Sequence, residues 1–453
     1  MISKNLDNSI TDKIVIQLTF KNVSPLLIGG GLDNSSDLNI VRLSNGFPFI
    51  PGSSIAGCLL RCFQDNQDEL DPGGISFRQF WGIDISENEK IQSHISIGPS
   101  TMTSGEYSTM VYDGVRIDPK TGTAADQAKY DYEYVNPGVE FRCEIVVTIR
   151  KQFEATDFKR LSYFVITCFE NEFQIGAKAN KGFGELDLSN AVTDVFKFPK
   201  DFDRWMQFCA DGQITDARDL SKLMNPIEYK AISNLRIRIN ANLAGPIITA
   251  LNIDGPGKVD KIQFHRESGK YIIPASSILG PISHRARKIL NTVYMNQANS
   301  LSIHKNIFGD VEEETQISCR SKIIVKESEI RNSREHSQTR IQVDRFTGGV
   351  INSALAESLS IIPAGDKNVE FIIILKNPEP KEITLLMMVI KDLLTGDLAI
   401  GGEKGIGRGL FRGGEVSLEY NHDKLEETTF EINMNGDVTG NIGFINNYNS
   451  FME

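Results

Sequence analysis

The feature that most constrains the fold of this chain is an internal duplication. Four blocks of the first half recur in the second half in the same order: FPFIPGSSIAG (47–57) as KYIIPASSILG (270–280), VRIDPKTG (115–122) as IQVDRFTG (341–348), VEFRCEIVV (139–147) as VEFIIILKN (369–377), and IGAKANKGFG (175–184) as IGGEKGIGRG (400–409). The first two blocks are shifted by 223 and 226 residues. A nearly constant offset indicates one folding unit copied in tandem. The chain is therefore expected to form two similar domains.

The repeat boundaries predict the domain organisation. We place the first domain at residues 1–198 and the second at 233–420, joined by a linker at 199–232. The remaining C-terminal tail, 421–453, is rich in asparagine and is expected to be loosely ordered. A length of 453 residues agrees with this division, because single domains usually hold roughly 100–200 residues.

Hydrophobic spacing predicts the same elements in each half. KIVIQLTF (13–20) and LRIRINANL (235–243) alternate in the way of strands with one buried face. After the P-x-S-S block of the first half, apolar residues follow at helical spacing: Ile55, Cys58, Leu59, Cys62 and Phe63. Further strands, a second helix and a last strand complete the pattern. The order β-α-β-β-α-β predicts an α+β protein with two tandem ferredoxin-like (RRM-like) units, a fold that several families use to bind RNA.

Charge and cysteine content exclude several classes of protein. Asp and Glu number 59 against 48 Lys and Arg, a net charge of −11, so the chain is not a polybasic protein that grips nucleic acid over its whole surface. A local basic groove is compatible with this balance, and we expect partner subunits to cover much of the remaining surface. The six cysteines form no C-x-x-C pair and are expected to be free thiols of a reducing cytoplasm.

Neither the N-terminus nor the interior predicts a membrane segment. The first residues, MISKNLDNSITDK, lack the apolar core of a signal peptide. The most apolar stretch, 383–394, is shorter than a membrane span and contains Lys391 and Asp392. We therefore expect a cytoplasmic protein without membrane contact.

The two glycine-rich blocks are candidate phosphate-binding loops. Glycine allows backbone N–H groups to approach a phosphate closely, and the interspersed basic residues add positive charge. The alternative is a tight helix-to-strand connection that needs positive φ, but two copies that both keep basic residues favour binding. Neither block is a P-loop, because the G-x-x-x-x-G-K-[ST] order is absent. The candidate RNA contacts here are Lys178, Lys181, Gly182, Lys404, Gly407 and Arg408.

The P-x-S-S blocks place two serines at the start of a helix in each half. Free N–H groups and the helix dipole attract anions at such a position. Ordinary N-capping by one of the serines is the alternative. An arginine lies further along each helix, where it could also meet a phosphate. The candidate RNA contacts here are Ser53, Ser54, Arg61, Ser276, Ser277 and Arg285.

These motifs together resemble a known family. LLIGGGLDNSSDLNIVRLSNGFPFIPGSSIAGCLLR, IDPKTGTA, EYVNPGVEF and IGAKANKGFGEL resemble the RAMP superfamily of CRISPR-associated proteins, and within it the backbone subunit of type III effector complexes. PIITALNIDGPGKVDKIQF, YIIPASSILG, VDRFTGG and IGGEKGIGRG in the second half resemble the same subunit. A chain with two such units is similar to the fused double-backbone subunit of the type III-D group.

The resemblance implies a function and a set of partners. Backbone units of this family stack along a guide (CRISPR) RNA, and each projects an inserted hairpin, the thumb, that displaces a nucleotide at regular intervals. The implied partners are the guide RNA, complementary target RNA, other RAMP backbone subunits and the large polymerase-like subunit.

The resemblance also implies a catalytic aspartate. In catalytic members of the family, an aspartate in the loop after the first strand cuts the target RNA with a divalent cation. Asp37 and Asp260 each stand 14 residues before the proline of the P-x-S-S block, which favours them over their neighbours Asp33 and Asp254. A carboxylate is a hard ligand for Mg²⁺ or a similar cation, and RNA phosphates would have to supply the other ligands. The alternative for any loop aspartate is a turn or a solvated surface.

Two segments are thumb candidates. In the first half we place the thumb at Thr121–Tyr134, where Tyr130, Tyr132 and Tyr134 could stack on bases. In the second half, 318–345 is the most basic run of the chain and includes Arg345, which we expect to contact RNA. A solvated surface loop is the alternative for this run.

Three functions remain open from the sequence. The first is a metal-dependent endoribonuclease within a guide-RNA complex, and the second is a scaffold of the same complex that binds RNA without cutting it. The third is a guide-processing RAMP nuclease that uses general acid-base chemistry. That class usually relies on a histidine near the first helix, but the first half has none before His94, while His265 and His284 leave the second half open.

Overall fold

The chain divides into two compact units. In the computed structural model, the described residues are 9–30, 37–70, 75–82, 92–118, 124–151, 155–171, 173–214, 217, 233–252, 261–266, 269–293, 297–311, 318–421 and 425–440. Unit 1 covers residues 1–231 except 119–121 and 180–182, and unit 2 covers the remainder. Each unit is described by itself.

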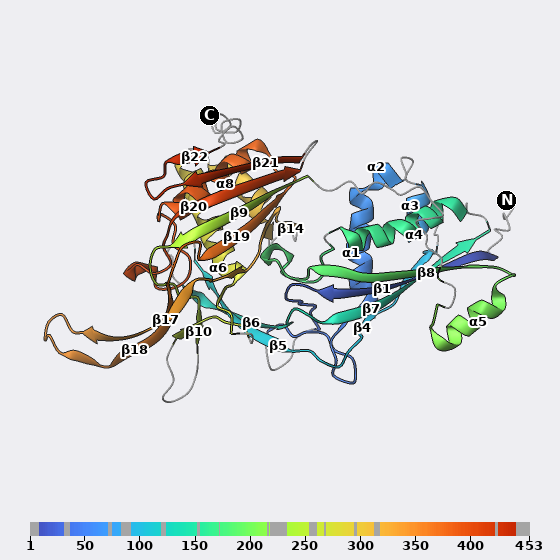
Figure 1. The fold of residues 1–453 in the computed structure, drawn as a ribbon, viewed down its shortest axis with the longest axis horizontal. Helices are drawn as coiled ribbons and strands as arrows, with labels where there is room; N and C mark the ends of the chain where they lie inside the picture. The colour runs from blue at the N-terminus through green and yellow to red at the C-terminus, as the bar shows by residue number, and fades with distance from the viewer. Residues whose placement is uncertain are drawn as a thin grey trace. The chain divides into compact units, whose positions relative to one another are not determined.

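Unit 1 is built on a six-stranded antiparallel sheet in the order β2-β4-β7-β1-β8, with β3 paired to β7. A separate hairpin, β5–β6, is inserted before β7 (Figure 1). The elements, in chain order, are β1 (Ile10–Asn22), β2 (Phe49–Ile50), α1 (Gly52–Asp65), α2 (Gln67–Leu70), α3 (Ile75–Trp81), β3 (Ile95–Ile97), β4 (Ser100–Met102), β5 (Thr109–Ile117), β6 (Ala124–Val135), β7 (Glu140–Arg150), α4 (Ala155–Glu170), η1 (Ala179–Lys181), β8 (Leu186–Lys197) and α5 (Phe202–Asp211).

Strand alternation explains how this sheet receives helices on both faces. Ile14, Ile16 and Leu18 of β1 are fully buried in the main core, which they share with α1 and α4. Val15 points to the opposite face, where it forms a small separate cluster with Phe208 of α5. Helix α5 lies within the segment 199–232 that the sequence assigned to the linker, and it belongs to unit 1. It covers part of the sheet face that an open RNA platform would expose.

Unit 2 repeats this plan with a six-stranded antiparallel sheet in the order β15-β19-β9-β20-β21-β22. Its long hairpin, β17–β18, joins β10 and β11 in a four-stranded sheet (Figure 1). The elements are β9 (Asn234–Leu243), β10 (Ala250–Asn252), β11 (Lys261–Gln263), β12 (Ile272–Ile273), α6 (Ala275–Val293), α7 (Gln297–Phe308), β13 (Asp310–Val311), β14 (Ser318–Cys319), β15 (Ile323–Val325), β16 (Ser328–Glu329), β17 (Ser333–Val343), β18 (Val350–Pro363), β19 (Val369–Lys376), α8 (Pro380–Leu394), η3 (Lys404–Ile406), β20 (Phe411–Asn421), β21 (Leu425–Ile432) and β22 (Val438–Gly440).

The two units share the arrangement of their central strands and main helices. The first strand (β1 or β9) lies between β7 and β8 in unit 1, and between β19 and β20 in unit 2. In unit 1, helix α1 follows β1 and helix α4 precedes β8. In unit 2, helix α6 follows β9 and helix α8 precedes β20. Both hairpins connect to the strand next to the first one. The predicted α+β class with two similar halves is confirmed.

The C-terminal region departs from expectation. β21 pairs with β20 along its length and buries Phe430 and Ile432 in the core of unit 2. The prediction of a loosely ordered tail is therefore wrong for 425–440, because alternating apolar residues add a strand to the sheet edge. Residues 441–453 lie outside the described part.

Two further features concern the cysteines and the helices. All six cysteines are free thiols, as predicted. Within the described residues, no helix combines the length and apolar character that a membrane crossing would need.

Candidate functional site

The glycine-rich loop of unit 1 is fixed to the segment that leaves β1. The Ala177 amide donates to the Leu27 carbonyl at 2.8 Å, and the Gly184 amide donates to the Pro25 carbonyl at 2.8 Å. The loop closes on itself through the Ile175 amide and the Gly184 carbonyl, 2.9 Å apart. These bonds hold the loop beside the strand exit that leads to Asp37.

The loop of unit 2 repeats the same bonds. The Gly402 amide donates to the Ile248 carbonyl and the Gly409 amide to the Pro246 carbonyl, both at 2.8 Å. Ile400 closes the loop on the Gly409 carbonyl at 2.9 Å. Equal hydrogen bonding at equal repeat positions shows that the two loops are the same structural device.

Local geometry explains the last glycine of each loop. Gly184 and Gly409 have φ of +77° and +74°, and a Cβ would lie 1.7 and 1.8 Å from the carbonyl oxygens of Ile175 and Ile400. Both positions therefore require glycine for folding. The amide of Gly407 is also used internally, since it donates to the Lys404 carbonyl at 3.0 Å. Gly407 is exposed, and its contact with RNA remains a prediction.

The hairpins meet the glycine loops at positions that the repeat makes equivalent. The shift of 226 residues between VRIDPKTG and IQVDRFTG equates Tyr112 with Gln338. Pairing within the hairpins, Tyr112 with Tyr132 and Gln338 with Ser358, then equates Tyr132 with Ser358. Asp131 is equivalent to Glu357 by the same registers. In the loops, the aligned blocks equate Lys178 with Glu403 and Phe183 with Arg408. We call this region the loop–hairpin junction.

In unit 1 the junction is aromatic. The Lys178 ammonium lies 4.1 Å from the ring centroid of Tyr132 and 5.2 Å from that of Tyr130. Phe183 packs edge-on against the rings of Tyr132 and Tyr134 at 6.0 and 5.5 Å. The side chains of Tyr132 and Tyr134 are 3% and 1% exposed, so they serve the core. The prediction that they stack on bases is wrong, because the loop covers their rings.

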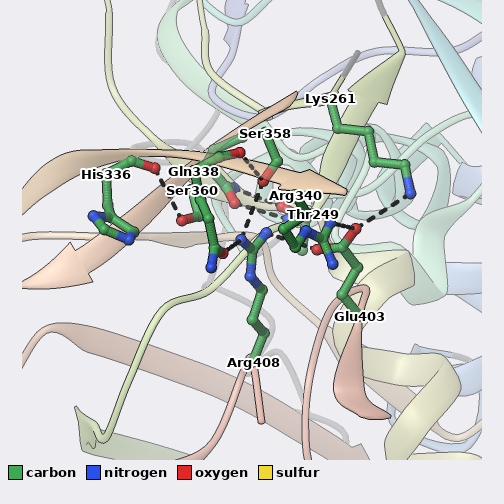
Figure 2. Close-up of polar contacts among 10 residues, drawn as sticks. Thr249, Lys261, His336, Gln338, Arg340, Ser358, Ser360, Glu403 and Arg408 are labelled. Atoms are coloured by element: carbon green, nitrogen blue, oxygen red, sulfur yellow. Dashed lines mark hydrogen bonds and ion pairs between the residues drawn. The ribbon is translucent and has the colours of Figure 1, made fainter. Parts of the chain in front are cut away.

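In unit 2 the same junction is ionic, as Figure 2 shows. Glu403 is the centre of the cluster. Its carboxylate lies 2.5 Å from Arg340 Nη2 on β17, 2.7 Å from Arg408 Nη1 and 3.4 Å from Lys261 Nζ on β11. Three cations thus share one carboxylate. The side chains of Lys261 and Arg340 are 44% and 30% exposed, so the surplus positive charge reaches solvent.

Arg408 is the buried member of this cluster. Its side chain is 2% exposed, and its Nη2 donates to Gln338 Oε1 at 2.6 Å and to Ser358 Oγ at 3.1 Å (Figure 2). Burial lowers the pKa of Arg408, against the attraction of Glu403. Arg408 thus fastens the loop to the hairpin, and its contact with RNA remains a prediction.

The electrostatics of Glu403 follow from the same contacts. Burial alone would raise the pKa of Glu403, but the hydrogen bond from Arg340 and the charges of Arg408, Arg340 and Lys261 lower it on balance. Glu403 therefore stays ionised and holds together β11, the hairpin and the loop.

Of the two predicted catalytic aspartates, one is described. Asp37 is exposed and lies beside strand β6 of the unit 1 hairpin, where its amide donates to Asp131 Oδ1 at 2.6 Å. Asp260 lies outside the described residues. Among the described residues, no three His, Cys, Asp or Glu side chains converge in a way that could hold a metal ion. A cation at Asp37 would need further ligands from RNA, as the sequence analysis assumed.

The serines of the P-x-S-S blocks do not cap their helices as expected. Helix α1 begins at Gly52 with Pro51 as N-cap, and no side chain caps it. Ser53 and Ser54 therefore lie inside the first turn, with Ser53 exposed. Ser276 and Ser277 of α6 are half-buried in the first turn of their helix. The four serines remain candidates for anion contact at helix starts.

The predicted basic residues differ in availability. Arg61 is half-exposed and pairs with Asp65 at 3.6 Å, whereas Arg285 is tied to Asp392 of α8 at 2.5 Å. The Arg285 prediction is weakened, since this ion pair joins two core helices. The remaining candidates lie in short helices and turns. Lys181 ends η1 and Gly182 follows it, Lys404 begins η3, and Arg345 is exposed at the hairpin turn beside the 99% exposed Phe346.

The hairpins are longer than the predicted thumbs. In unit 1 the hairpin strands span Thr109–Ile117 and Ala124–Val135, and in unit 2 they span Ser333–Val343 and Val350–Pro363. The predicted segments cover most of β6 and all of β17 but miss β5 and β18. The predictions also missed Glu403, and they assigned Arg340 only to the basic run 318–345. The signal for Glu403 was available, because Glu403 replaces a lysine at the repeat position of Lys178.

Histidine 94 is a core residue. Its side chain is 1% exposed, and Nδ1 lies 2.6 Å from the Thr148 carbonyl. Burial lowers the pKa of His94 against this hydrogen bond, and the charge of Arg150 lowers it further. A neutral, buried ring of this kind does not suit the role of a solvent-facing acid or base in unit 1.

Comparison with known proteins agrees with the duplication. The family model of the RAMP superfamily matches the chain in two regions, residues 19–187 and 228–412. Each region contains one of the long hairpins and one glycine loop. No curated protein matches the chain in sequence.

Proposed function

Because the chain belongs to the RAMP superfamily, we propose that it is an RNA-binding subunit of a CRISPR effector complex. The observation that carries this proposal is the duplication of one device, a glycine loop bonded to the exit of the first strand and joined to a hairpin. A repeated device suits a repeated ligand, and the sugar-phosphate backbone of RNA is such a ligand.

The finer assignment is a fused double-backbone subunit of a type III complex, III-D-like, with two ferredoxin-like domains. The strand order supports the ferredoxin-like topology. In unit 1 the first strand, β1, lies between β7 and β8, and in unit 2 the first strand, β9, lies between β19 and β20. The guide RNA would follow the loops, and the hairpins β5–β6 and β17–β18 would serve as thumbs. Exposed Arg345 and Phe346 at the turn of β17–β18 suit contact with a nucleotide.

The same proposal includes cleavage of complementary target RNA at Asp37 and Asp260. A Mg²⁺ or similar ion held by the aspartate and RNA phosphates would stabilise charge that develops on the scissile phosphate. Asp37 itself would supply a fixed carboxylate beside the hairpin, and the hairpin would hold the RNA backbone for in-line attack by a 2′-hydroxyl or a water. Exposure of Asp37 next to β6 supports this role.

The test uses the assembled complex with guide RNA, target RNA and Mg²⁺. Asp37→Ala, Asp260→Ala and the double variant are compared with the wild type by counting target fragments. We expect each single variant to lose its own cut and the double variant to lose both. Retention of every fragment by all three variants would contradict the catalytic assignment. Loss of guide-RNA binding is not expected, and filter binding provides the control.

A non-cutting scaffold is the second candidate. It is favoured by the incomplete metal ligand set among the described residues of the protein. This candidate is supported if the wild-type complex binds guide RNA tightly and leaves the target RNA intact. Cleavage by the isolated chain in EDTA would instead select a guide-processing nuclease.

A further inference from the structure

The segment that carries Asp37 is fastened to the second strand of the unit 1 hairpin. Leu38 pairs in parallel with Tyr132, and the Glu133 amide donates to the Leu38 carbonyl at 2.9 Å. Arg42 holds Glu133 through two hydrogen bonds of 2.9 and 2.6 Å. These hydrogen bonds lower the pKa of Glu133 on balance, although burial acts in the opposite direction. Three successive contacts thus fix the backbone that follows Asp37.

Asp37 and Asp131 bind each other reciprocally. The Asp37 amide donates to Asp131 Oδ1 at 2.6 Å, and the Asp131 amide donates to Asp37 Oδ2 at 3.0 Å. Each carboxylate therefore accepts the backbone N–H of the other residue in a charge-assisted hydrogen bond. The pair fixes the backbone of Asp37 and one of its carboxylate oxygens. The other oxygen, Oδ1, has no hydrogen bond to a described residue.

Unit 2 keeps the same strand pairing and the same acidic hairpin position. Lys261 pairs in parallel with Ser358, as Leu38 pairs with Tyr132. Glu357 precedes Ser358 as Asp131 precedes Tyr132, so both hairpins carry an acidic residue at this position. Asp260 itself lies outside the described residues, but it precedes Lys261 as Asp37 precedes Leu38. The duplication thus preserves an acidic residue at this hairpin position, although the neighbouring junction residues have diverged.

We propose that Asp131 is a positioning residue for Asp37. This inference rests on the proposed cleavage of target RNA. Asp131 acts as a hydrogen-bond acceptor for the amide of Asp37, and its backbone N–H orients the carboxylate of Asp37. Positioning through the hairpin couples the cutting residue to the element that holds the RNA backbone.

The test compares Asp131→Ala with Asp131→Asn in the assembled complex. Asparagine keeps a side-chain oxygen that can accept the Asp37 amide, and both variants keep the backbone N–H. We expect Asp131→Ala to slow the cut assigned to Asp37 by about 10- to 100-fold, and Asp131→Asn to restore most of the rate. Asp113→Ala is the matched control, because Asp113 lies opposite Asp131 on β5 and pairs only with Lys129, 3.7 Å away, among the described residues. The cut assigned to Asp260 should persist in every variant and reports an intact complex.

A second readout does not depend on activity. Hydrogen exchange of the full-length protein should quicken at the amide of Asp37 in Asp131→Ala and stay near the wild-type rate in Asp131→Asn. A wild-type cleavage rate in Asp131→Ala, or equal losses in both variants, would overturn the inference. If Asp37→Ala keeps its cut, the proposed function fails. If Asp37→Ala loses its cut while Asp131→Ala does not, only the positioning role fails.

Discussion

In both units the glycine loop is fastened to the hairpin at the loop–hairpin junction, but the contacts differ. They are aromatic in unit 1 and ionic in unit 2. Unit 1 places Lys178 over the rings of Tyr130 and Tyr132, whereas unit 2 places Glu403 among Arg340, Arg408 and Lys261. The backbone is the same in both, since Lys178 and Glu403 have φ of +59° and +56°. The duplication therefore conserved the loop geometry and left the side chains free to change together as a set.

Coordinated change is visible at further positions of the junction. Gly114 of unit 1 is replaced by Arg340 in unit 2, and a Cβ at Gly114 would lie 2.3 Å from the ring of Tyr130. Tyr130 itself is replaced by Ala356, which leaves room for the arginine. Replacing only one of these residues by its counterpart from the other unit would thus create a clash or leave a buried charge unpaired.

The largest expected effect tests the shared backbone. Gly184→Ala and Gly409→Ala should each destabilise their unit by more than about 4 kcal/mol, because the new Cβ would overlap a carbonyl oxygen. Gly57→Ala and Gly280→Ala are matched controls at equivalent helical positions with open space around them, and they should be neutral or slightly stabilising. Unfolding in urea, monitored by amide hydrogen exchange, measures the stability of each unit separately. A mild effect in only one unit would break the equivalence of the loops.

The next effect tests the chemical difference. Glu403→Ala leaves Arg408 buried without its carboxylate and should destabilise unit 2 by about 3–5 kcal/mol. Lys178→Ala removes a cation from aromatic faces and should cost unit 1 only about 0.5–2 kcal/mol. Glu415→Ala is the control, because Glu415 pairs with Lys367 on the surface of the same unit and should change little. Equal losses at positions 178 and 403 would mean that the two junctions do not differ in energetics.

The smallest expected effect is a difference between the two units in how their stability depends on pH. The pKa of His94 is lowered from its ordinary 6.5, so the unfolded chain takes up a proton first and unit 1 loses stability as the pH falls below about 6.5. The pKa of Glu403 is lowered from 4.5, so its contribution to unit 2 is present above that pH and is lost only as the pH falls through and below it.

Tryptophan fluorescence can follow this difference, because both tryptophans, Trp81 and Trp205, belong to unit 1. Unfolding of unit 1 in urea should need less denaturant at pH 5.5 than at pH 7.5, and His94→Gln should remove most of that shift. Exchange of unit 2 amides should change little over the same interval. An unchanged midpoint for the wild type would contradict the assignment of His94.

The sequence predicted the parts of the fold that depend on repetition and period. Alternating residues such as Ile14 and Ile16 gave the central strand, and the repeated glycines gave both loops. The burial of Arg408 was not predicted, because basic residues in a loop suggest phosphate contact unless their buried partners are known. Gln338 and Ser358 lie about 70 and 50 residues from Arg408, and only the folded hairpin brings them to it. The covering of Tyr132 by Phe183 was hidden for the same reason.

We expect the RNA to follow the glycine loops and the hairpins of both units. Photo-crosslinking tests this path in the assembled complex with guide RNA that carries 4-thiouridine at successive positions, and mass spectrometry identifies the attached peptides. We predict crosslinks in both repeats, at the glycine loops (175–184 and 400–409) and the two hairpins, recurring with a regular nucleotide spacing. Crosslinks confined to one unit, or absent from both loops and hairpins, would contradict this expectation.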